Sequence, residues 1–120
     1  MIVIDDPQVF TTPNATMTTF AAPSRGSAEL STWRVSMAEG ASGPEHVVDR
    51  EQVWLPLSGS LTVTVTDEST VVGLGQSLVL PAGVSRQISA PSGPVEAVVC
   101  MPAGATVTAN GEARDLPWAR

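Results

Sequence analysis

Apolar and polar residues alternate strictly over residues 61–66, which read Leu-Thr-Val-Thr-Val-Thr. A period of two places the apolar side chains on one face of a β-strand and the hydroxyl side chains on the other. Glycine and proline divide the chain at roughly the 8–12-residue spacing of β-sandwiches and barrels. No stretch has a convincing helical period, so we predict an all-β fold. Further strands are expected over residues 32–37, 52–57, 77–80, 86–89, 95–101 and 106–109.

The pattern also predicts how the chain is organised. Ser58-Gly59-Ser60 stands between two expected strands, and this composition is typical of the turn of a β-hairpin. A chain of 120 residues suits one domain with one core. Residues 1–24 are rich in Thr and Pro, and we interpret them as an N-terminal arm or as strands exchanged with another protomer. We assign residues 25–112 to a barrel and residues 113–120 to a C-terminal tail.

Charge and composition exclude several classes of partner. The formal net charge is −6, and the six basic residues are scattered along the chain. Neither nucleic acid nor an anionic membrane surface is therefore an expected partner. No apolar run approaches the roughly 20 residues of a membrane span, and the N-terminus has no secretory pattern. With Cys100 as the single cysteine, these features favour the cytoplasm.

Two spaced motifs are more specific than the strand pattern. The first consists of Gly40, His46, Val48, Gln52 and Gly59, and the second of Gly75, Pro81, Gly83 and Arg86. In the spacing of these residues the chain resembles the small single-domain cupins, including bacterial ones, whose ends are similar to Leu116-Pro117-Trp118. The resemblance implies a cupin-type double-stranded β-helix, also called a jelly-roll β-barrel.

The departures from the cupin motifs concern the metal site. The family pattern supplies three imidazoles and one carboxylate, and this chain has His46, Val48, Gln52 and Arg86 at those positions. Valine has no donor atom, an amide oxygen is a weak ligand for a transition metal, and a guanidinium has no lone pair to give. We therefore predict a degenerate metal-binding motif, with no metal and no other cofactor. One alternative is a metal site rescued by the nearby carboxylates of Glu45, Asp49 or Glu51.

The residues left at these positions form a candidate site for an organic molecule. We predict His46 and Arg86 as catalytic residues that face one cavity, with the imidazole kept neutral by burial and by the guanidinium. Arg86, Gln52 and Trp54 are predicted to bind substrate. The guanidinium would hold a carboxylate or enolate, the amide would orient a polar group, and the indole would form an apolar wall. The alternative for His46 and Arg86 is a purely structural role.

These observations lead to one functional hypothesis and two alternatives. We expect a metal-independent cupin that binds a small anionic or carbonyl-bearing organic molecule. If it is an enzyme, it would catalyse isomerisation, elimination or cyclisation by proton transfer. The alternatives are a non-catalytic sensor or binding module, and a metal-dependent cupin enzyme with rescue ligands. The resemblance also implies a homodimer, to which the apolar residues 1–4 could contribute.

Overall fold

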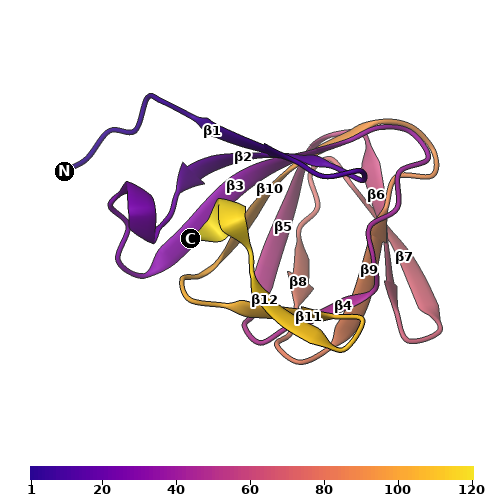
Figure 1. The fold of residues 1–120 in the computed structure, drawn as a ribbon. Helices are drawn as coiled ribbons and strands as arrows, with labels where there is room; N and C mark the ends of the chain where they lie inside the picture. The colour runs from indigo at the N-terminus through magenta and orange to yellow at the C-terminus, as the bar shows by residue number, and fades with distance from the viewer.

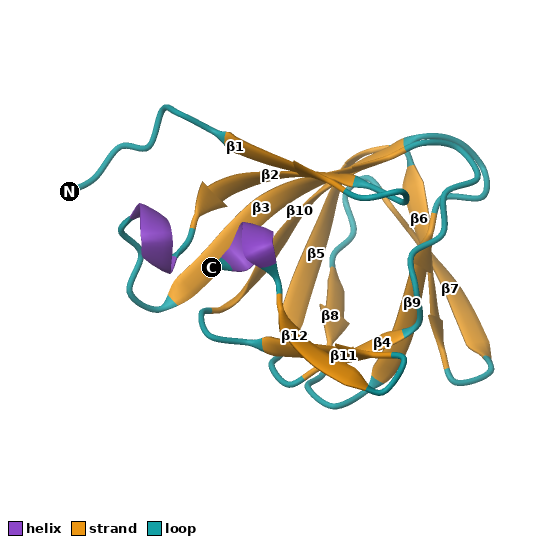
Figure 2. Ribbon diagram, in the orientation of Figure 1, coloured by secondary structure: helices purple, strands orange, loops and turns teal.

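The computed structural model describes all 120 residues and contains two six-stranded antiparallel sheets that face each other (Figures 1 and 2). We call them sheet A and sheet B. The strands of sheet A, in spatial order, are β1 (Gln8–Thr11), β2 (Thr16–Ala21), β3 (Leu30–Met37), β10 (Val95–Pro102), β5 (Gln52–Ser58) and β8 (Leu78–Leu80). The strands of sheet B are β12 (Glu112–Asp115), β11 (Thr106–Ala109), β4 (His46–Val48), β9 (Ser85–Ser89), β6 (Ser60–Val65) and β7 (Glu68–Gly73). This arrangement confirms the predicted all-β jelly-roll barrel.

The alternation of side chains decides which faces of the sheets form the core. In β3, Trp33, Val35 and Met37 are buried, whereas the intervening Arg34 is exposed. The same inside–outside alternation runs along β10, where every second residue from Val95 to Met101 is buried. The two inner faces therefore supply a single apolar core of buried residues between the sheets.

The hairpin predicted around Ser58-Gly59-Ser60 is wrong. Strands β5 and β6 do not pair, because β5 lies between β10 and β8 in sheet A while β6 lies between β9 and β7 in sheet B. The turn is instead a corner at which the chain crosses from one sheet to the other. Gly59 has a φ of +71° at this corner, a backbone conformation that glycine adopts at no steric cost.

The two ends of the chain take part in the sheets. Residues 8–21, which we assigned to an arm or to exchanged strands, form β1 and β2 and pair within their own chain. Residues 112–115 pair with β11, and a short 3₁₀ helix, η2 (Pro117–Ala119), follows against sheet A. A second 3₁₀ helix, η1, spans Pro23–Arg25. None of the helices has the length or apolar content that a membrane crossing requires.

Candidate functional site

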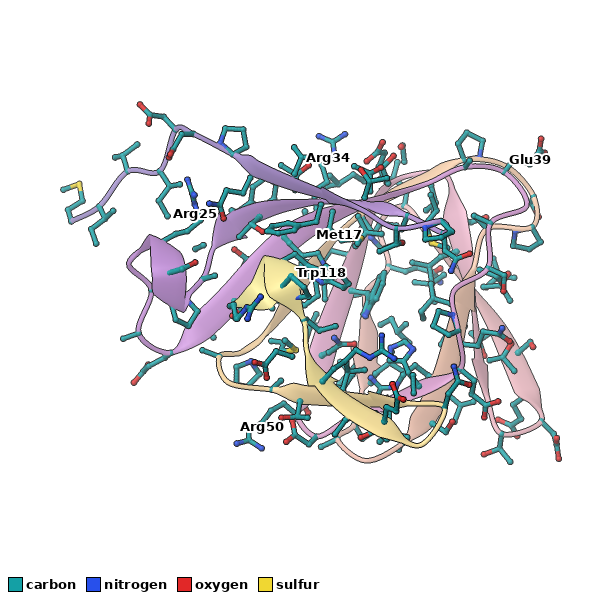
Figure 3. The ribbon with its side chains drawn as sticks, viewed as in Figure 1. Met17, Arg25, Arg34, Glu39, Arg50 and Trp118 are labelled. Atoms are coloured by element: carbon teal, nitrogen blue, oxygen red, sulfur yellow. The ribbon has the colours of Figure 1, made fainter.

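A cavity of about 410 Å³ lies between the sheets, within the usual size range of small-molecule sites. Most of its lining is apolar, and all three tryptophans of the chain, Trp33, Trp54 and Trp118, contribute to it. Trp54 therefore stands where the sequence predicts an apolar wall. Figure 3 shows the side chains of Met17 and Trp118 between the two sheets. The polar residues of the lining are Thr12, Asn14, His46, Gln52, Asn110 and Arg114.

His46 lines this cavity in a defined tautomer. Its Nδ1 lies 2.9 Å from the carbonyl oxygen of Pro44, which can only accept a hydrogen bond. In the neutral imidazole Nδ1 therefore carries the proton and Nε2 keeps its lone pair. Burial lowers the pKa of His46, and the nearby Arg86 guanidinium lowers it further, while the hydrogen bond to Pro44 opposes both effects. The direction agrees with the prediction of a neutral imidazole, so Nε2 is suited to accept a proton.

We expect the imidazole of His46 to titrate below its usual pKa of about 6.5. His46 is the only histidine, so its ring proton signals in NMR are unambiguous, and the urea-unfolded chain supplies the reference pKa. Because the folded pKa is the lower one, the contribution of His46 to stability is complete above the unfolded pKa and is lost as the pH falls through the folded pKa. His46→Gln should remove this part of the pH dependence of urea unfolding. A folded pKa equal to or above the unfolded one would contradict the expectation.

Gln52 is buried, and its amide is held in one orientation. Its Oε1 accepts hydrogen bonds from Arg86 Nη1 at 3.2 Å and from Trp54 Nε1 at 3.3 Å. Two N–H donors on one atom identify that atom as the oxygen of the amide. The Nε2 group donates one hydrogen bond, to the Met101 sulfur at 3.5 Å, so the other of its two N–H bonds has no protein acceptor. Gln52 lines the cavity and therefore has a donor to offer a ligand.

Arg86 lies in the core and does not line the cavity, contrary to the expectation that it faces the cavity with His46. The two residues are opposite each other on β4 and β9, but the Arg86 guanidinium is engaged by three acceptors of the protein. Nε donates to the Val84 carbonyl and Nη2 to the Pro81 carbonyl, both at 2.8 Å, and Nη1 donates to Gln52. None of the four ion pairs in the structure includes it. A role of Arg86 toward a ligand stays a prediction, and in this geometry it would act through Gln52.

The donor set does not fit the metal that the cupin motifs imply. Val48 is fully buried without a donor atom, and the one oxygen of the Gln52 side chain already accepts two hydrogen bonds. A cationic guanidinium stands at the fourth position and would repel a metal cation. None of the proposed rescue carboxylates lines the cavity: Glu45 accepts a hydrogen bond from Ser85, Asp49 accepts one from the Thr106 backbone, and Glu51 is exposed. Nowhere do three His, Cys, Asp or Glu side chains lie together as a metal site.

Several residues that border the cavity were not predicted from the sequence. They come from the β1–β2 turn, the β11–β12 hairpin and the C-terminal segment, and they include Asn14, Asn110 and Arg114. The C-terminal segment is fixed to sheet A by two hydroxyl groups. Thr19 Oγ1 donates to the Trp118 carbonyl at 2.7 Å, and Ser31 Oγ donates to the Ala119 carbonyl at 2.6 Å. The similarity of Leu116-Pro117-Trp118 to small cupins was the one signal in the sequence that this segment belongs to the barrel.

Comparison with known proteins supports this interpretation of the fold. The family model described as "Cupin domain" matches residues 33–101, which is more than half of the chain. The comparison with curated protein sequences finds no match. The family match thus begins within β3 and ends within β10, and it includes all four positions of the metal motif.

Solved structures with similar folds differ in how much of their own length is matched. The polyketide cyclase RemF from Streptomyces resistomycificus superposes with a TM-score of 0.78 at 18% identity, over 99% of this chain and 96% of its own. An RmlC-like cupin from Shewanella frigidimarina gives 0.69 at 18% identity, over 80% and 83% of the two chains. A variant of oxalate decarboxylase from Bacillus subtilis gives 0.71 at 21% identity, over 82% of this chain but only 28% of its own. At these identities the similarity shows the fold alone.

Proposed function

Because the chain belongs to the cupin family, we propose that it binds a small, largely apolar organic molecule with a carbonyl or hydroxyl group and moves a proton on it without a metal ion. The observation that carries the proposal is that one cavity is lined both by His46, whose Nε2 is a free acceptor, and by Gln52, whose amide has an unused N–H. A base and a hydrogen-bond donor in one cavity suit abstraction of a proton from the carbon next to a carbonyl group. The tryptophan walls would bury the apolar body of the molecule.

Each side chain has a distinct part in the proposed step. The Gln52 N–H donates to the carbonyl oxygen and stabilises the negative charge that develops there. His46 Nε2 takes the proton from the adjacent carbon, and the molecule becomes an enolate. Burial and the Arg86 cation disfavour the resulting imidazolium, so the proton is readily returned to another atom of the molecule. Arg86 holds the Gln52 oxygen and so keeps the amide N–H available to the ligand.

Return of the proton at a different position gives an isomerisation, and a second carbonyl group in the molecule makes cyclisation possible. The enolate carbon would attack that carbonyl carbon, a carbon–carbon bond would form, and the new alkoxide would take the proton back from His46. We propose cyclisation as the first reaction to test, because the polyketide cyclase RemF, by its name a cyclase, is structurally similar over nearly the full length of both chains.

An acetylnaphthalene tests the proposal, because it combines an apolar ring system with a carbonyl group and exchangeable methyl protons. All three tryptophans line the cavity, so quenching of their fluorescence reports binding there. In deuterated buffer we expect the protein to speed exchange of the methyl protons, as followed by NMR, and His46→Gln to slow this exchange by about a hundredfold. Arg34→Gln, a change on the outer surface, should leave both binding and exchange unchanged. Failure of the probe to bind would contradict the proposal.

A non-catalytic binding module is the second candidate. One observation favours it: the cavity lining contains no Asp, Glu, Cys, Lys or Tyr, so His46 has no acid–base partner there. Binding of the acetylnaphthalene without acceleration of proton exchange would identify this second function. Catalysed exchange that depends on His46 would exclude it.

We also propose that two copies of the chain form a homodimer through the outer face of sheet A. Leu30, Leu55, Leu57 and Val79 are each 43–55% exposed on strands of this sheet. Light scattering should give twice the monomer mass of 12.4 kDa. Leu55→Lys should shift the protein toward the monomer, and Val71→Lys, at a valine of sheet B that is 62% exposed, should not. A parent protein of monomer mass at micromolar concentration would contradict the proposal.

A further inference from the structure

Arg114 is the one cationic side chain that borders the cavity, whereas the motif spacing predicted that Arg86 would do so. Arg114 stands opposite Val107 in the antiparallel pair of β12 and β11. Directly opposed residues of such a pair project from the same face of the sheet. Val107 is buried and lines the cavity, so Arg114 also lies on the cavity side, and both residues belong to the lining.

Arg114 marks the open end of the cavity. Its side chain is 57% exposed, whereas Gln52, another polar residue of the lining, is only 2% exposed. Asn14 and Asn110 border the cavity from the two neighbouring turns and add amide groups to the lining. The lining thus combines a buried amide at Gln52 with an exposed cation at Arg114.

The charge of Arg114 is incompletely satisfied by the protein. Its nearest acid is Glu112, two residues earlier on β12, with Oε2 at 3.6 Å from Arg114 Nη2. Glu112 is 79% exposed and does not line the cavity, and such exposed pairs contribute little to stability. No acidic residue lines the cavity at all. The whole chain has a net charge of −6, but the cavity lining carries the cation Arg114 and no acid. The opening therefore favours an anion.

We infer that Arg114 is a specificity-determining residue that selects ligands with an anionic group at the end opposite their carbonyl group. This inference rests on the proposed function, because it takes the carbonyl to lie at Gln52. The ligand class is then an elongated molecule with an apolar body, a carbonyl at the buried end and a carboxylate at the opening. The carboxylate displaces Glu112 from Arg114, and the guanidinium donates to it through paired N–H groups.

Two probes that differ only at one end test the inference. One is the acetylnaphthalene, and the other is an acetylnaphthoic acid whose acetyl and carboxylate groups stand at opposite ends of the rings. Binding is measured by tryptophan quenching at low salt. Arg114→Gln should weaken binding of the acid by about tenfold and leave the neutral probe within about twofold, and added salt should shrink the difference. Glu112→Gln should strengthen binding of the acid by a few fold, because it removes a competitor for Arg114.

Arg50→Gln is the matched control, since Arg50 also has a weak exposed pair, with Asp49 at 3.8 Å, and does not line the cavity. It should change the binding of neither probe. Equal losses for both probes in Arg114→Gln, or no loss for either, would overturn the inference while leaving the proposed function intact. Failure of the parent protein to bind either probe would overturn the proposed function and the inference with it.

Discussion

Replacing Gly59 with alanine is expected to destabilise the fold by about 3–5 kcal/mol, which is among the largest effects of a single substitution. A Cβ atom at this position would lie 2.2 Å from the Pro94 carbonyl oxygen and 3.3 Å from the Val95 Cα. These are backbone atoms of the segment that enters β10, so no side-chain rotation can relieve the clash. The left-handed backbone of residue 59 adds a conformational cost. Urea unfolding of the two proteins measures the difference.

Gly75→Ala separates the two causes. Gly75 has a similar φ of +84°, but a Cβ there would meet no atom within 4 Å. Only the conformational cost remains, and we expect a loss of about 1–2 kcal/mol. Equal losses at the two glycines would show that the close approach to Pro94 does not exist in solution. A small loss at both would contradict the corner between β5 and β6 as described.

Arg86→Met is expected to destabilise the protein by about 2–4 kcal/mol, although it removes a buried charge that has no ionic partner. The substitution keeps an elongated side chain but leaves the carbonyl groups of Val84 and Pro81 without their donor. It also leaves the Gln52 oxygen with Trp54 as its single donor. The pKa of His46 should rise, because the guanidinium lowers it in the parent. Urea unfolding and the NMR titration of the single histidine measure these two effects.

Arg34→Met is the control for this substitution. Arg34 pairs with Glu96 at 2.8 Å on the outer surface, where an ion pair contributes no more than about 1 kcal/mol. Arg86→Lys adds a second comparison, since it keeps the charge but cannot donate in the three directions of the guanidinium. If Arg86→Met were as stable as the parent, the hydrogen-bond network around Gln52 would have no structural importance.

The strands that the sequence predicted are those with a buried face. Residues 61–66 and 95–101 alternate because one of their faces contacts the core, and the structure places β6 and β10 there. Strand β12 was missed because all four of its residues, Glu112–Asp115, are exposed and carry no alternation. The hairpin error has a different cause. A glycine turn between two strands is a local feature, and it does not reveal whether the strands pair or belong to opposite sheets.

The candidate site could be predicted only in part. Motif spacing brought His46, Gln52 and Trp54 to one cavity, because alternation fixes which face of a strand a residue occupies. Motif spacing could not show that the Arg86 guanidinium donates to the backbone carbonyls of Val84 and Pro81. The positions of these carbonyls depend on how the chain folds after β8. Arg114 was missed because the segment that carries it borders the cavity but lies far from both motifs in the sequence.

Metal analysis of the purified protein tests the central claim most directly, namely that a guanidinium and an amide have replaced the metal site of the barrel. The chain, without an affinity tag, is dialysed against iron, manganese, nickel or zinc salts, and its metal content is determined by mass spectrometry. We predict far less than one ion per chain for each metal, because His46 is the single strong ligand at the four motif positions. About one ion per chain, lost again in His46→Ala, would contradict the account.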